Sequence, residues 1–66
     1  MTKEDKVELI NKMCFLLSDK NYIALENELR RLKYFFDENQ VTAIEDYVFG
    51  INYAFYTTDE FCKNYL

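Results

Sequence analysis

The stretch VTAIEDYVFGINYAFY, residues 41–56, decides the fold, because its pattern fits either a helix or a strand. Its helical stripe consists of Val41, Ile44, Val48, Ile51 and Phe55. From Tyr47 to Phe55, large apolar residues also occupy every second position, as in a strand. A strand needs a partner for its backbone groups, and the sequence offers no second strand candidate. We therefore predict a helix from about residue 40 to Tyr56.

Two amphipathic helices are predicted before this stretch. Thr2 is a good N-cap, with Asp5 at the capping-box position three residues later. The apolar stripe of this first helix consists of Val7, Ile10, Cys14 and Leu17, with Met13 beside it. Residues 18–21 are polar and predict a turn. The second helix carries the stripe Tyr22, Leu25, Leu29, Leu32 and Phe36.

The later helix starts are marked by further capping residues. Asp37 and Thr42 could each cap the third helix, and the sequence does not choose between them. Thr57, with Glu60 three residues later, predicts a short last helix that must dock to be stable. The chain has one glycine and no proline, which favours helices. We predict one all-α domain, residues 1–66: a three-helix bundle, or a helical hairpin plus a third helix, with a short C-terminal fourth helix.

The composition offers little for catalysis or metal binding. Without histidine there is no Ser-His or Cys-His nucleophile, and one glycine cannot build a phosphate loop. Cys14 and Cys62 are far apart in sequence, and we expect two reduced, packed thiols. The adjacent acidic pairs lie near predicted helix starts, where the helix dipole favours them. We expect no enzyme activity, no cofactor and no metal.

Charge and hydropathy limit the cellular locations and the classes of partner to be expected. The longest apolar run, Met13 to Leu17, is far too short for a membrane span, and no apolar signal region follows residues 1–6. We therefore expect a cytoplasmic protein. Residues 1–33 carry net charge +1 and residues 34–66 carry −5, with one positive cluster at Arg30, Arg31 and Lys33. Direct nucleic-acid binding is not expected from this balance.

The aromatic residues supply the candidate site. Ten of the twelve lie in residues 34–66. On a helical wheel, Phe49, Tyr53 and Tyr56 fall opposite the apolar stripe, among Glu45, Asp46 and Asn52. Either the last helix covers them or a partner does, and we predict that these six residues bind a partner. Gly50 lies on the same side, which suggests a kink or the close approach of another backbone.

These features predict a protein that acts by contact. A core of this size supplies only about 3–5 kcal/mol, so support from a partner is expected. We predict a small acidic binding module that occludes its target, as an inhibitor or adaptor, including the phage type that acts on a host enzyme or defence complex. The alternative is a helical homo-oligomer with a structural role. Four off-stripe apolar residues favour self-association: Phe15, Leu16, Ile23 and Tyr34.

Overall fold

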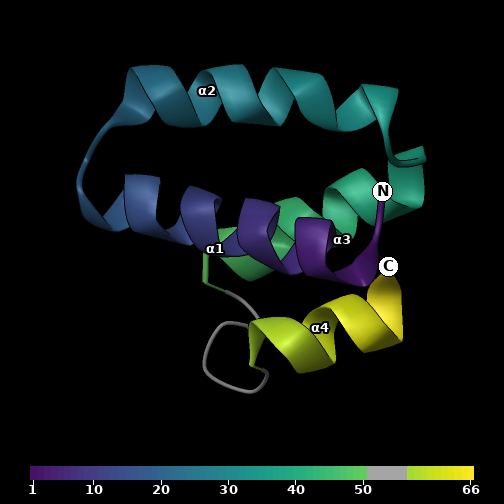
Figure 1. Ribbon diagram of the computed structural model, residues 1–66. Helices are drawn as coiled ribbons and strands as arrows, with labels where there is room; N and C mark the ends of the chain where they lie inside the picture. Colours follow the sequence, from purple (N-terminus) through teal and green to yellow (C-terminus); the bar gives the residue numbers. More distant parts are fainter. Residues whose placement is uncertain (51–56) are drawn as a thin grey trace.

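The computed structural model describes residues 1–50 and 57–66, and these residues form helices without any strand (Figure 1). The elements are α1 (Lys3–Ser18), α2 (Tyr22–Arg31), the 3-10 helix η1 (Leu32–Tyr34), α3 (Glu38–Val48) and α4 (Thr58–Tyr65). The predicted all-α class with a short C-terminal helix is confirmed. Residues 41–48 of the ambiguous stretch are helical.

Side-chain caps begin all four of the α-helices in the described part of the chain. The capping residues are Thr2, Asn21, Asp37 and Thr57. The choice left open for α3 falls on Asp37, whose carboxylate accepts from the Gln40 backbone N–H at 2.8 Å. The Gln40 side chain in turn accepts from the Asp37 backbone N–H at 3.1 Å. Two backbone N–H groups that have no partner within the helix are therefore both hydrogen-bonded. Thr42 consequently lies inside the helix.

The end of α3 corrects the predicted helix. A single helix from about residue 40 to Tyr56 is wrong, because α3 ends at Val48 and Phe49 is its C-cap. Gly50 follows with φ +111°, a conformation that side chains with a Cβ rarely adopt, and its N–H donates to the Tyr47 carbonyl at 3.3 Å. Gly50 therefore terminates the helix rather than kinking it. Apart from its chain neighbours, no described atom lies within 4 Å of the Cβ position, so the described part of the chain brings no other backbone close to Gly50.

Gly50→Ala is expected to lower the free energy of unfolding by about 1–2 kcal/mol, because alanine is strained at a positive φ. Urea unfolding followed by circular dichroism measures the loss. Gly50→Asn is the matched control and should lose less, since asparagine tolerates positive φ better than alanine. Equal stability of the alanine variant and the wild type would contradict the assignment of Gly50 as the helix stop.

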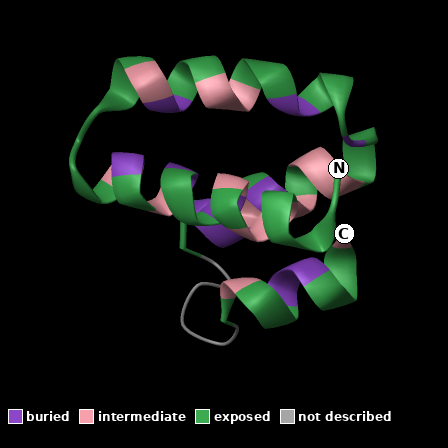
Figure 2. Ribbon diagram, in the orientation of Figure 1, coloured by how far each residue is buried: buried purple, intermediate pink, exposed green. Residues whose placement is uncertain are grey.

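The hydrophobic core is built around α1, against which α2, α3 and α4 all pack (Figure 1). Figure 2 shows the buried positions of the helices turned towards one another. The buried residues are Ile10, Met13, Leu16, Leu25, Leu32, Phe36, Ile44, Tyr47, Val48, Phe61 and Cys62. Leu16 was predicted to lie off the stripe, but three neighbouring helices give α1 a wider buried face. Tyr22 was predicted on a stripe but is exposed, because α2 packs mainly against α1.

The short helix α4 docks through stacking and polar contacts. The Phe61 ring, fully buried, lies 4.3 Å from the Tyr47 ring with an interplanar angle of 7°. The Thr58 hydroxyl donates to Asn11 Oδ1 at 2.6 Å, and Lys6 Nζ donates to the Leu66 backbone carbonyl at 2.8 Å. These contacts join the two ends of the chain. None of the described helices is long and apolar enough to cross a membrane.

Candidate partner-binding surface

The predicted six-residue site is only partly described by the structure. Phe49 is 53% exposed, Glu45 is exposed and Asp46 is half-buried. Asn52, Tyr53 and Tyr56 lie outside the described residues. The helical spacing that joined Phe49 to the two tyrosines does not apply, because α3 ends before Gly50. Partner binding by the six residues stays a prediction.

Several aromatics of the acidic half pack in the core. Phe36, Tyr47 and Phe61 are buried, and α4 covers Tyr47 rather than Phe49. The two most exposed large apolar side chains of the described chain are Ile23 at 79%, which lies outside that half, and Tyr34 at 73%, which lies at its first position. The aromatic count of the acidic half was therefore an incomplete guide to the exposed surface.

The first outward surface belongs to α2 and the turn after it. Among the ten residues of α2, all described, Leu25 alone is buried. Ile23, Asn27 and Arg30 recur at spacings of four and three, so they share one side of the helix, and all three are exposed. Tyr34 borders the same shallow hollow as Asn27 and Arg30. We call Ile23, Asn27, Arg30 and Tyr34 the α2 face.

The α2 face is positively charged at its C-terminal end. Arg30 pairs with Glu26 at 2.6 Å, but both side chains are well exposed, so the pair leaves the guanidinium accessible. Lys33 Nζ lies 5.5 Å from the centre of the Tyr34 ring, within cation–π range. Cations at a helix C-terminus also complement the helix dipole, which explains part of the cluster without a ligand. The face combines exposed apolar groups with this charge.

The second outward surface runs along α3. Glu38, Thr42, Glu45 and Phe49 recur at spacings of four, three and four, which places them on one side, and all are exposed. We call these four residues the α3 face. It shares Glu45 and Phe49 with the predicted site but extends towards the helix start instead of the helix end. Reading Gly50 as a helix stop would have revealed this from the sequence.

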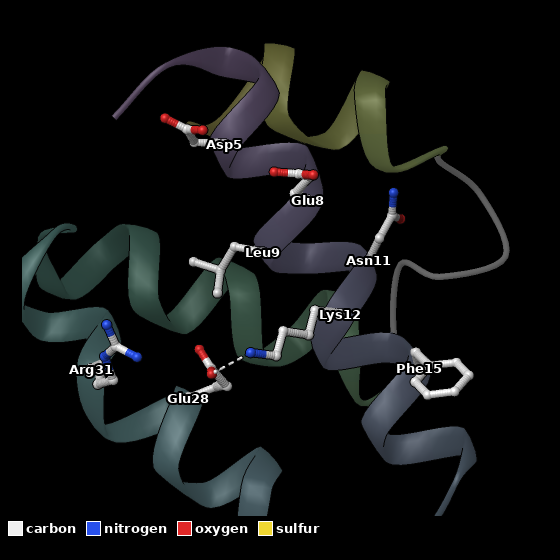
Figure 3. A pocket seen from close by; sticks show the side chains of 8 residues that line it. All are labelled: Asp5, Glu8, Leu9, Asn11, Lys12, Phe15, Glu28 and Arg31. Carbon is white, nitrogen blue, oxygen red and sulfur yellow. Dashed lines mark hydrogen bonds and ion pairs between the residues drawn. The ribbon is translucent and has the colours of Figure 1, made fainter.

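A groove runs between α1 and α2, and contacts across it fix the position of α2 (Figure 3). Lys12 Nζ of α1 reaches across it to Glu28 Oε1 of α2 at 3.0 Å, and the Glu28 side chain is only 13% exposed. Leu9 lies between the two helices, with Arg31 on the α2 wall. The groove measures about 650 Å³ but is open and lined by charges of both signs. Small-molecule sites are usually enclosed and mostly apolar, so this groove is better explained as the place where an ion pair joins the two helices.

The cysteines have the surroundings of packed residues. Both thiols are free, Cys62 being buried and Cys14 half-buried. Burial raises the pKa of each thiol; at Cys62, Lys6 and Lys3 lower the pKa and Asp59 raises it, each by less than burial does. Thiols with a raised pKa are protonated at neutral pH and are poor nucleophiles. Among the described residues, no three His, Cys, Asp or Glu side chains gather where they could hold a metal ion.

Comparison with known proteins does not place the chain in a family. The chain matches no protein-family model, no curated protein and no solved structure. The α2 and α3 faces are therefore the features from which a function can be inferred.

Proposed function

We propose that this protein is a binding module that acts by contact, occupying a surface of a partner protein as an inhibitor or adaptor. The observation that carries the proposal is the construction of α2, a helix with one buried residue, whose solvent side bears Ile23 and is continued by Tyr34 of η1. Exposed large apolar side chains grouped with charges mark interaction surfaces more often than chance positions do.

The α2 face has the chemistry of a helix that docks in a groove. Such helices present apolar anchors on one side; here Ile23 and Tyr34 are the apolar groups, and the polar Asn27 and Arg30 lie between them on the same side. Tyrosine and arginine are also enriched among residues that dominate binding energy, because each combines a large contact area with directional hydrogen bonding. Tyr34 and Arg30 supply this pair of residues on the α2 face.

The acidic balance of the chain supports occlusion of a basic target. The net charge of −4 would attract a positively charged site from a distance and speed the encounter. The α3 face, with Glu38 and Glu45 beside Phe49, is the second surface on which such a target could dock. A phage-type inhibitor of a host enzyme or defence complex would need no more than such a surface.

Affinity purification with quantitative mass spectrometry tests the proposal. Three tagged variants are compared with the wild type: Ile23→Asp on the α2 face, Phe49→Ala on the α3 face, and Phe15→Ala as control. Phe15 is 67% exposed but lies on neither face. We expect Phe15→Ala to retain the specific partners, and at least one face variant to lose them. Retention of the same partners by all three variants would refute binding through these faces.

The occlusion step is tested with the purified partner. Adding the wild-type protein should inhibit the partner's activity or compete with its other ligand, while the face variant that lost binding should not. An adaptor would instead allow the partner and a further protein to bind at once. If binding is retained with neither inhibition nor bridging, the occlusion mechanism is wrong although the contact is real.

A further inference from the structure

We infer that the α2 face of one molecule docks on the α3 face of a second copy of this chain. The inference rests on the proposal that these faces bind protein, and it names the partner. The α2 face carries Arg30 between apolar groups, and the α3 face carries Glu38 and Glu45 beside Phe49. Opposite charges beside exposed apolar groups give the two faces complementary chemistry.

The two faces also match in dimensions. Each consists of four residues over twelve positions, residues 23–34 and 38–49, and all eight residues are exposed. In each face the aromatic residue comes last in the chain: Tyr34 in one and Phe49 in the other. Laid antiparallel, Ile23 would approach Phe49 and Tyr34 would approach Glu38, while Arg30 would lie nearest Thr42 and Glu45. This arrangement would bury apolar groups and pair the central charges.

Such a contact is heterologous, because two different surfaces meet. Since α2 and α3 are separate helices, each molecule keeps one free face after the first contact. Assembly therefore continues as an open chain or closes into a ring, and its smallest closed form is a two-fold dimer in which the same contact is made twice. A contact one helix wide on each side is small, so we expect a weak and transient association.

Sedimentation velocity over a range of concentrations up to about 1 mM tests the inference at low salt, where the attraction between Arg30 and Glu45 is screened least. The wild type is expected to rise above its monomer mass of 8.0 kDa as concentration increases. Raising the ionic strength from about 0.02 M to about 0.5 M shortens the Debye length from about 20 Å to about 4 Å and should weaken association about tenfold.

Charge reversal identifies the two faces. Arg30→Glu and Glu45→Arg should each abolish association, because each places like charges across the contact. The double variant R30E/E45R should restore it, and so should an equimolar mixture of the two single variants. The controls Lys63→Glu and Glu8→Arg make the same charge changes at exposed positions of α4 and α1 and should associate like the wild type.

Circular dichroism checks that each variant is folded, which is expected because Arg30 and Glu45 are exposed and, among the described residues, the one ion pair of Arg30 is the exposed pair with Glu26. A wild-type monomer at every concentration would overturn the inference. So would association that persists in both single variants, or that the double variant fails to restore. A monomer that still captures a partner through Ile23 would refute self-association and leave the proposed function intact.

Discussion

Phe61→Ala is expected to lower the free energy of unfolding by about 3–5 kcal/mol. Phe61 is fully buried and stacks on Tyr47 at 4.3 Å and on Tyr65 at 5.3 Å, so truncation removes both ring contacts and leaves a cavity. The expected loss equals the whole stability of about 3–5 kcal/mol that a core of this size supplies. The variant should therefore be largely unfolded, or retain α1–α3 with α4 undocked.

Urea unfolding measures the loss, and hydrogen exchange separates the two outcomes. If only α4 undocks, amides of α4 lose protection while those of α1 keep theirs. Phe15→Ala makes the same deletion at an exposed position and should change stability by no more than about 0.5 kcal/mol. A loss below about 1 kcal/mol for Phe61→Ala would contradict the docking of α4 described here.

Leu25→Ala is expected to cost about 2–4 kcal/mol and to act chiefly on α2. Leu25 is the one buried residue of α2, all of whose residues are described, and Lys12–Glu28 is the ion pair that ties this helix to α1. Once the leucine side chain is removed, the apolar residues of α2 that still pack against the core are the partly buried Ala24 and Leu29. Hydrogen exchange should show α2 amides opening before those of α1 and α3, and binding through the α2 face should weaken as well.

Ile23→Ala is the matched control for Leu25→Ala, since it shortens a neighbouring aliphatic residue of the same helix on the solvent side. Its stability should stay within about 0.5 kcal/mol of the wild type, while partner binding falls. The two variants thus separate the contribution of α2 to stability, which Leu25→Ala reduces, from its contribution to partner binding, which Ile23→Ala reduces. Equal losses of stability in both variants would show that α2 is not oriented as described.

The α-helix starts could be predicted because capping is a local interaction. Thr2, Asp37 and Thr57 each accept a hydrogen bond from a backbone N–H three residues later, so the signal lies within four residues of sequence. The end of α3 carried an equally local signal in Gly50, but the apolar stripe that continues to Phe55 outweighed it in the prediction. A stripe shows which residues could share a face, and a glycine at positive φ decides where the helix stops.

The exposed faces were harder to predict because exposure depends on neighbours. Ile23 and Tyr34 are uncovered because α2 packs mainly against α1, and nothing within α2 specifies how many helices surround it. Tyr47 is buried because α4, which begins 11 residues further along the chain, stacks Phe61 on it. Identical side chains become core or surface according to such long-range contacts.

By itself, the amino-acid sequence determined the helical class, the caps Thr2 and Thr57 and the absence of a histidine-based site, since these follow from composition and from hydrogen bonds between close neighbours. It left the α3 cap open between Asp37 and Thr42 and did not single out Asn21. Only the tertiary structure decided that the α2 face is exposed, that α4 covers Tyr47, and that Glu38, Thr42, Glu45 and Phe49 are all left exposed. The physical reason is that burial is a property of helix packing: a side chain stays in water unless another element of the fold covers it.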